Sequence, residues 1–314
     1  MHLVPSLVRR SLRKLMGVDR PLKTVSAVAS ATYRQRPTDN EDAVGTAECP
    51  AHGLRAVVIA DGLGSQEHAG LGAQWSVETV THLIESATRW SAPDMRHLFV
   101  QARQRLRERA EVYCAQENLV CDWEQSFGTT LIVAVEDEHS LWLGYVGNGA
   151  IWHVRGGFNE FSENQYLPWN ALNYLNPHTL QNEHGKEALY RLISTAEDDD
   201  AEPTILQIQK DTVHGDLLMI CTDGIHSNDQ VNVGRTKDST IWLKMEQPLL
   251  RFFEALKELF SRNDPETVTD QRLRAALERY LERLCADGLL DDDSSLGVII
   301  TSTALHYQAH RTKR

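Results

Sequence analysis

The stretch VVIADGLGS, residues 57–65, combines an apolar run, an aspartate and a glycine-rich turn. Residues 57–60 are typical of a buried β-strand, and Asp61 and Gly62 follow directly at its end. A carboxylate in this position is costly unless it is paired or bound to a cation, and few basic residues lie near it in the sequence. Glycine after the aspartate lets the backbone approach an ion, although Asp-Gly alone is also a common turn dipeptide.

Three further stretches place acidic residues where an expected strand begins or ends: TDNEDAVG (38–45), LLMICTDGIHS (217–227) and LLDDDSSLGVII (289–300). Taken alone, NED at 40–42 is most simply a solvated turn. Four such stretches in one chain favour a metal centre instead. Oxygen ligands without His or Cys are typical of Mg²⁺ or Mn²⁺ rather than zinc.

Around these acids, the apolar pattern predicts alternating groups of strands and helices. Strands are expected over 24–33, 54–60, 129–135, 140–147, 150–155, 205–210, 216–222 and 296–302. Helices are expected over 69–90 and 94–117, and a later pair carries apolar stripes within 249–260 and 273–284. Short turns between strands favour antiparallel pairing, and this order suits antiparallel sheets with helices packed outside.

Composition limits the classes of function. The chain has 314 residues, is 41% hydrophobic and carries a net charge of −12, so a nucleic-acid-binding surface is not expected. Basic residues gather only at the ends: residues 1–22 form a basic amphipathic segment that suits a partner or a membrane surface, and 306–314 form a basic tail. The first segment lacks the apolar stretch of a secretory signal or a membrane span.

The five cysteines are scattered, without metal-binding spacing, which favours reduced thiols in a cytoplasmic protein. Residues 156–204 are the least regular part of the chain, and we expect a flap-like segment there.

The ordered motifs NED, ADGLGS…AGLGA, GTTL, GYVGNGAIWHVR, GDLLMICTDG and DDDSSLGVII resemble the metal-dependent Ser/Thr protein phosphatases of type 2C, the PPM family. The resemblance spans residues 24–302, and the DGLGS form is similar to the bacterial branch. It implies an α+β fold over 23–305: a four-layer α-β-β-α sandwich of two antiparallel sheets flanked by helix pairs. It also implies hydrolysis of phosphoserine and phosphothreonine monoesters by a metal-activated water, with a phosphoprotein, either a Ser/Thr kinase or the target of one, as substrate.

Carried over by position, the ligands of two Mg²⁺ or Mn²⁺ ions are Glu41, Asp61, the Gly62 carbonyl, Asp223 and Asp292. In the family pattern Asp61 bridges the two ions, Glu41 binds one of them directly or through water, and Asp42 holds water beside them. Asp292 fits the pattern best in the acidic triplet, but a one-residue slip would select Asp291 or Asp293.

Two departures from the family pattern concern the third, weaker metal ion that its members bind. Asn148 and Ser227 stand where the family often has acids, which weakens the case for that ion, although an Asn carbonyl can still bind one.

Two further departures concern the phosphate group and the catalytic acid. Pro37 replaces the expected phosphate-binding arginine, and Arg36 or Arg34 could serve if the loop bulges. Leu63 replaces a histidine that acts as an acid in some relatives. His68, further along the same loop, is a candidate substitute, but a loop histidine is more often a surface residue, so the catalytic acid stays unassigned. Asn148, Ser227 and the displaced arginine motivate an alternative, a weak or inactive phosphatase-fold scaffold that binds a signalling partner.

Overall fold

The computed structural model describes residues 23–33, 40–120, 126–155, 171–181, 187–196, 202–226, 230–235, 241–246, 248–262 and 267–311. The basic segment 1–22, Arg36 and Ser227 lie outside the described residues, as do Arg34 and Pro37.

Two five-stranded sheets form the centre of the molecule. The first has the order β1-β14-β11-β6-β7, with bounds β1 Val25–Ala31, β14 Ser294–Ile300, β11 Asp216–Cys221, β6 Ala150–Arg155 and β7 Ala171–Asn173. The second has the order β10-β5-β4-β3-β2, with bounds β10 Thr204–Gln209, β5 Ser140–Val146, β4 Leu131–Glu136, β3 Leu54–Asp61 and β2 Asp42–Cys49. Every pair of neighbouring strands in these two sheets is antiparallel.

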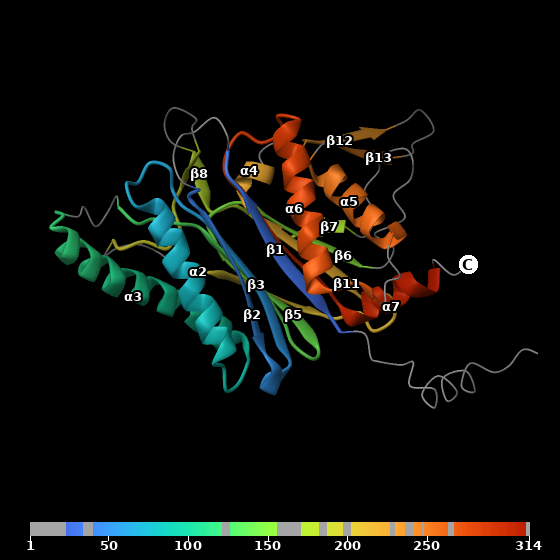
Figure 1. Ribbon diagram of the computed structural model, residues 1–314, viewed down its shortest axis with the longest axis horizontal. Helices are drawn as coiled ribbons and strands as arrows, with labels where there is room; N and C mark the ends of the chain where they lie inside the picture. The colour runs from blue at the N-terminus through green and yellow to red at the C-terminus, as the bar shows by residue number, and fades with distance from the viewer. Residues whose placement is uncertain are drawn as a thin grey trace, which may run out of the picture.

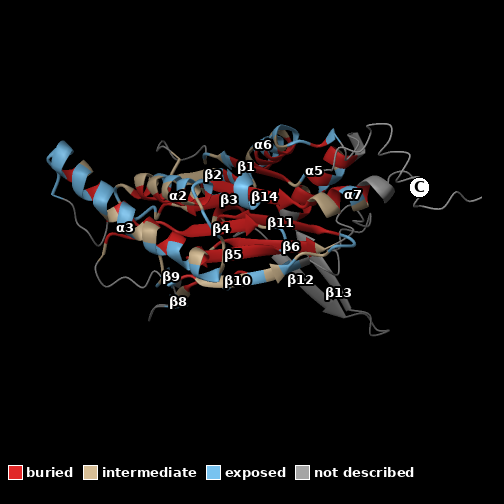
Figure 2. Cartoon of the chain, turned by 90° about the horizontal axis from the view of Figure 1, so that it is seen from below, coloured by how far each residue is buried: buried red, intermediate tan, exposed pale blue. Residues whose placement is uncertain are grey.

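Helices cover the outer face of each sheet (Figure 1). Helices α2 (Ala69–Glu85) and α3 (Ala92–Glu117) pack on the second sheet, and α5 (Leu249–Arg262) and α6 (Asp270–Ala286) pack on the first. Three apolar cores separate the layers, one under each helix pair and one between the sheets. Figure 2 shows β4, β5, β6 and β11 buried in the centre of the molecule, while α3 exposes its outer face. The expected four-layer α-β-β-α sandwich is confirmed.

The buried runs explain why the strands could be recognised. Strands β11 and β14 are buried along their whole length, because the first sheet is covered on one face by helices and on the other by the second sheet. A strand buried on both faces needs apolar residues at nearly every position rather than at alternate ones.

Several elements differ from the sequence expectation. The segment expected to be irregular contains the three-residue strands β7, β8 (Thr179–Gln181) and β9 (Glu187–Leu189), which are too short to leave a periodic pattern. Strands β12 (Gln230–Arg235) and β13 (Ile241–Glu246) form a separate hairpin that was not predicted. Helix α7 (Ser302–Arg311) crosses the expected start of the basic tail and buries Ala304 and Leu305 in the core.

The cysteines also differ in part from the expectation. Cys49, Cys221 and Cys285 are not disulfide-bonded. Cys114, near the end of α3, is disulfide-bonded, so the expectation of five reduced thiols is wrong for this residue.

Candidate metal centre

Asp61 lies at the end of β3, in a turn that several hydrogen bonds hold in place. Its backbone N–H donates to Thr130 Oγ1 at 3.0 Å, and its carbonyl accepts from the Thr130 N–H at 2.8 Å. The next N–H, that of Gly62, donates to the Glu41 carbonyl at 3.1 Å. A Cβ on Gly62 would lie 2.6 Å from the Ala69 carbonyl carbon, so only glycine fits between these backbones.

Asp42 stands directly opposite Asp61 in the β2–β3 register. One of its carboxylate oxygens, Oδ2, accepts a hydrogen bond from Thr222 Oγ1 at 3.0 Å. The other, Oδ1, is buried and has no hydrogen-bond partner within the described part of the chain. A buried carboxylate oxygen without a donor is rare, and an ordered water or a bound ion is the usual explanation.

Asp223 is the first residue of the short helix α4 (Asp223–His226), just after β11. Its Oδ2 accepts from Asn148 Nδ2 at 2.7 Å, so the neutral side chain in the turn after β5 directly contacts a predicted ligand. Asn148 is one of the two departures that concern the third metal ion. In this structure its amide is used as a hydrogen-bond donor to a carboxylate.

The acidic triplet 291–293 divides into different roles. Asp293 is buried, and its two carboxylate oxygens accept from the backbone N–H groups of Tyr33, at 2.6 Å, and Glu41, at 2.9 Å. It therefore holds the described residues on either side of 34–39. Asp292 is half-buried and its negative charge acts on both Asp61 and Asp223. This division supports Asp292, the residue preferred from the sequence, over Asp293 as the ligand.

The remaining predicted residues include Glu41, Arg36 and His68. Glu41 joins the site through its backbone, which bonds to Gly62 and to Asp293. The phosphate-binding candidate Arg36 lies outside the described residues, and the same holds for Ser227. His68 packs its ring against Tyr113 and Phe127, with ring centroids 5.3 and 5.1 Å away. Its ring is thus engaged in an aromatic cluster, which does not favour His68 as the catalytic acid.

The electrostatics tie the carboxylates into one cluster. Burial raises the pKa of Asp61 well above its usual range, and the charges of Asp42, Asp223 and Asp292 raise it further. Burial also raises the pKa of Asp42 to about 7, with the charge of Asp293 adding to the effect. The pKa of Asp223 is raised by burial and by the charge of Asp292, against the opposing hydrogen bond from Asn148. A divalent cation would relieve this mutual repulsion.

These residues fit a divalent metal in their donor chemistry. The donors are all oxygens, which suits Mg²⁺ or Mn²⁺, and no described residue forms a hydrogen bond with the buried Asp42 Oδ1. Across the ranges that the structure describes, no three Asp, Glu, His or Cys side chains are already spaced as ligands of a single ion. Two of the carboxylates are engaged in hydrogen bonds with neutral side chains instead: Asp42 with Thr222, and Asp223 with Asn148.

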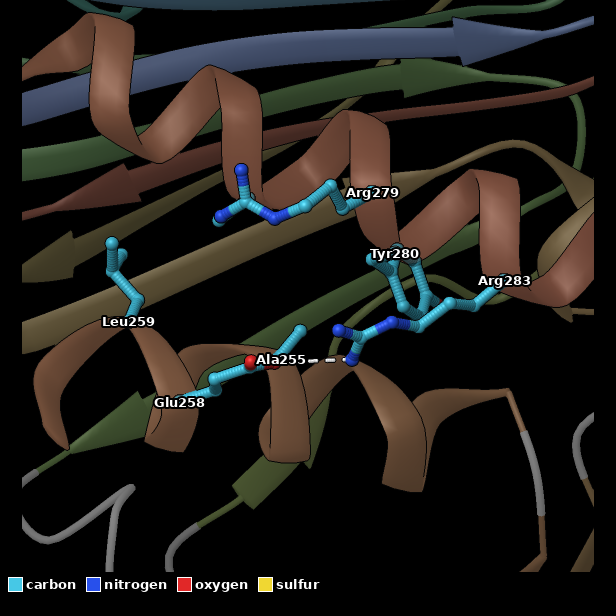
Figure 3. Close-up of a pocket in the computed structure, with 7 residues that line it drawn as sticks. Ala255, Glu258, Leu259, Arg279, Tyr280 and Arg283 are labelled. Carbon is cyan, nitrogen blue, oxygen red and sulfur yellow. Dashed lines mark hydrogen bonds and ion pairs between the residues drawn. The ribbon is translucent and has the colours of Figure 1, made fainter. Parts of the chain in front are cut away.

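A pocket elsewhere has a different character. It lies between α5 and α6 and is lined by Ala255, Glu258, Leu259, Ala276, Arg279, Tyr280 and Arg283 (Figure 3). Arg283 is paired with Glu258 across the pocket at 3.1 Å. None of the clustered aspartates lines this pocket, so it is separate from the candidate metal centre.

Sequence reasoning missed the neutral partners of the carboxylates. Thr222 immediately precedes Asp223, and its hydroxyl also accepts the Ser295 N–H at 2.9 Å. Asn40 Oδ1 accepts the N–H of Asp42 at 2.9 Å and so shapes the turn that carries it. Their position in the sequence could have indicated them, because each of these residues lies inside a motif that also supplies a predicted ligand.

A two-sheet sandwich flanked by helix pairs, with a cluster of carboxylates at the strand ends, is the arrangement expected of the metal-dependent phosphatase class. A family model described as protein phosphatase 2C matches residues 31–282 of the chain. The protein therefore belongs to the protein phosphatase 2C family and is a metal-dependent phosphoprotein phosphatase acting on serine and threonine. This membership does not favour the alternative of an inactive scaffold. No curated protein sequence is significantly similar to the chain.

Solved structures of bacterial phosphatases share the fold at low sequence identity. The serine/threonine phosphatase of S. agalactiae has a TM-score of 0.59 and 13% identity over 88% of this chain and 99% of its own. PppA of Pseudomonas aeruginosa, a key regulatory component of T6SS, has a TM-score of 0.54 and 18% identity over 88% and 98%. The catalytic domain of PstP, solved with two manganese ions, has a TM-score of 0.55 and 17% identity over 88% and 98%.

Proposed function

We propose that this phosphatase uses two divalent ions held by Glu41, Asp61, the Gly62 carbonyl, Asp223 and Asp292. The observation that carries the proposal is the convergence of charge on the half-buried Asp61 at the end of β3, where Asp42, Asp223 and Asp292 all act on one carboxylate. Asp61 is central to this cluster, as a bridging ligand must be. The PstP catalytic domain, a structural neighbour, holds two manganese ions, which supports the same number here.

The protein's own residues prepare the site for a phosphate monoester. Bound divalent ions supply Lewis acidity and lower the pKa of water, so that a phosphorus–oxygen bond can be hydrolysed without a covalent intermediate. Asp42 contributes the buried Oδ1, an acceptor suited to holding a water, while Thr222 fixes its orientation through Oδ2. Arg36 remains the proposed contact for the phosphate group.

Mg²⁺ and Mn²⁺ both suit the oxygen donors, and we propose that either supports turnover. A third ion is not expected to bind tightly. Asn148 donates an N–H to Asp223 Oδ2, so its nitrogen faces the position where a cation would need an oxygen.

Hydrolysis of p-nitrophenyl phosphate and of phosphoserine and phosphothreonine peptides tests the assignment. We expect turnover only with Mg²⁺ or Mn²⁺ present, and Asp61→Asn should lower it by about a thousandfold or more. Asp137→Asn is a matched control: Asp137 accepts from Trp142 Nε1 at 2.6 Å in the β4–β5 turn, at the other end of the sheet. Wild-type protein that is inactive with every divalent ion, or an Asp61→Asn variant of undiminished activity, would refute the assignment.

Partners and location follow from the class of reaction. We propose a phosphoprotein substrate that is a Ser/Thr kinase or the target of one, and a cytoplasmic location. None of the helices in the described ranges has the length and apolar character needed to cross a bilayer. The disulfide at Cys114 would be exceptional in a reducing compartment. Cell fractionation followed by immunodetection tests the location, and recovery of the protein mainly outside the cytoplasmic fraction would contradict it.

Two proposals concern the ends of the chain and its flap. We propose that residues 1–22 form a separate basic segment that binds a partner or an anionic membrane surface, ahead of a phosphatase domain over 23–305. Residues 156–204 would serve as the flap, and the strands β7, β8 and β9 support some order in it. Removal of residues 1–22 should leave turnover of p-nitrophenyl phosphate unchanged, and a large loss of activity would contradict this division.

A further inference from the structure

The turn Gly147-Asn148-Gly149 connects β5 to β6, and within it the Asn148 side-chain amide donates a hydrogen bond to Asp223. Gly147 has φ of +98° and Gly149 of +112°, in the region that favours glycine. A Cβ on Gly147 would lie 2.6 Å from Thr130 Cγ2. The turn is therefore tightly enclosed, and whatever holds Gly147 also sets the position of Asn148.

His178 holds this turn through two reciprocal hydrogen bonds. Its backbone N–H donates to the Gly147 carbonyl at 2.9 Å, and its ring Nδ1 accepts the Gly147 N–H at 3.3 Å. The residue is 4% exposed. It comes from the segment between β7 and β8, 31 residues further along the chain.

The surroundings of the imidazole fix its orientation. The ring stacks on Tyr145, with centroids 5.1 Å apart and planes 21° from parallel, and Tyr190 packs edge-on against it. The second ring nitrogen, Nε2, lies 2.9 Å from Thr204 Oγ1 on β10. Because Nδ1 accepts from an amide, it carries no proton, and Nε2 must then be the protonated nitrogen that donates to Thr204.

We propose that His178 is a positioning residue for the metal centre, which couples the β7–β8 segment to Asp223 through the Gly147-Asn148 turn. The inference rests on the proposed function, since it assigns His178 a role in presenting a proposed metal ligand. The chain of contacts is continuous: His178 Nδ1 accepts the Gly147 N–H, the adjacent Asn148 donates to Asp223 Oδ2, and Asp223 is a residue that would hold an ion. Movement of the β7–β8 segment is thereby transmitted to a ligand.

A buried histidine can also act only as part of a core, and His153 provides that contrast. His153 is likewise 4% exposed, and its Nε2 lies 2.8 Å from Asp216 Oδ1. Asp216 starts β11, whereas Asp223 follows the end of the same strand. His153 is therefore buried and hydrogen-bonded without a path to the ligands, which makes it a matched control.

Two substitutions of His178 separate the ring nitrogens. Asparagine places its Oδ1 near the position of Nδ1 and can still accept the Gly147 N–H, whereas glutamine extends to the position of Nε2 and keeps only the Thr204 contact. Isothermal titration of the metal-free protein with Mn²⁺ measures the result. We expect His178→Gln to weaken Mn²⁺ binding about tenfold, as for other indirect partners of metal ligands. His178→Asn should stay close to wild type.

The controls make each outcome decisive. His153→Gln should lower the thermal midpoint without changing Mn²⁺ affinity, so a loss of affinity there would show that general destabilisation explains the effect. Equal affinity in the wild type, His178→Gln and His178→Asn would overturn the proposal. Wild-type protein that binds no Mn²⁺ would instead contradict the metal centre itself.

Nitrogen NMR of the wild-type protein tests the contact without a variant. In ¹⁵N-histidine-labelled protein we expect His178 to show an unprotonated Nδ1 and a protonated Nε2. A protonated Nδ1 would overturn the proposal, because it could not accept the Gly147 N–H, and this holds even if His178→Gln fails to fold.

Discussion

Thr222 Oγ1 donates a hydrogen bond to Asp42 Oδ2 over 3.0 Å, between positions 180 residues apart in the chain. Thr222 directly follows β11 of the first sheet, and Asp42 begins β2 of the second. The same hydroxyl accepts the Ser295 N–H at 2.9 Å. One neutral side chain therefore links the two sheets at the carboxylate cluster and orients Asp42 within it.

Replacing Thr222 with valine keeps the shape of the side chain but removes both hydrogen bonds. We expect Thr222→Val to lose about 1–3 kcal/mol of unfolding free energy, since Asp42 and the Ser295 N–H both lose a buried partner. Urea denaturation measures the loss. Thr222→Ser, which keeps the hydroxyl, should recover most of it. A valine variant as stable as the wild type would show that water replaces the threonine at no cost.

Asn148→Asp replaces the amide donor next to Asp223 with a second carboxylate. Without metal, the variant should lose about 1–3 kcal/mol of stability, because the Asp223 oxygen loses its donor and gains a negative neighbour. With Mn²⁺, calorimetry should detect an additional weak site. Asn148→Ala removes the hydrogen bond without adding charge, so it should gain no site. The same Mn²⁺ stoichiometry in all three proteins would contradict the role given to Asn148.

Gly62→Ala introduces a Cβ where the Ala69 carbonyl carbon lies 2.6 Å away and the Glu41 carbonyl oxygen 2.9 Å away. The backbone at Gly62, which adjoins Asp61 and contacts Glu41, must shift. A displacement of a ligand by about 1 Å can lower turnover about a hundredfold. Gly53→Ala is the matched control: Gly53 has φ of +62°, but a Cβ there meets nothing within 4 Å. It should cost stability and leave turnover unchanged. Equal activity of both variants would show that Gly62 is not constrained.

Asp216 provides a prediction about acid stability. Burial opposes its ionisation, but hydrogen bonds from His153, the Asp211 N–H and Arg155 outweigh it and hold the pKa below its ordinary value of 3.8. A carboxyl whose pKa is lower in the folded state stabilises the fold fully above the unfolded value. That contribution is lost as the pH falls through the folded pKa, so the relevant window begins near pH 4 and extends downwards.

Asp216→Asn should therefore be less stable than the wild type at pH 7, by about 2 kcal/mol, with a smaller difference at pH 3. Chemical denaturation over pH 3–7 measures the two profiles. Mn²⁺ affinity at pH 7 should not change, because Asp216 lies at the opposite end of β11 from Asp223. If the unfolding free energies of the two proteins changed in parallel between pH 3 and pH 7, Asp216 would not contribute to the loss of stability in acid.

The sequence predicts most of the fold for a physical reason. Both sheets are covered on both faces, so β11 and β14 contain the continuous apolar runs 217–221 and 296–300, and α5 and α6 carry clear apolar stripes. The position of Asp61 and Asp223 after such runs then identifies two members of the cluster. The three-residue strands β7, β8 and β9 leave no comparable pattern, because neither length nor burial constrains their residue types.

The contacts that organise the site could not be predicted from the sequence. Thr222, Asn148 and His178 act through hydrogen bonds to residues 180, 75 and 31 positions away, and only the completed fold brings these groups together. The disulfide at Cys114 was missed because cysteine number and spacing alone do not reveal pairing.

The carboxylates come from both sheets: Asp42 and Asp61 from the second, Asp223 and Asp292 from the ends of strands in the first. Ions bound between them would join the two halves of the sandwich, and a ligand that binds only the folded state stabilises it in proportion to its free concentration. The amount of this phosphatase in a cell should then depend on metal supply as well as on synthesis. A cell short of manganese or magnesium would lose the protein to proteolysis, not only its activity.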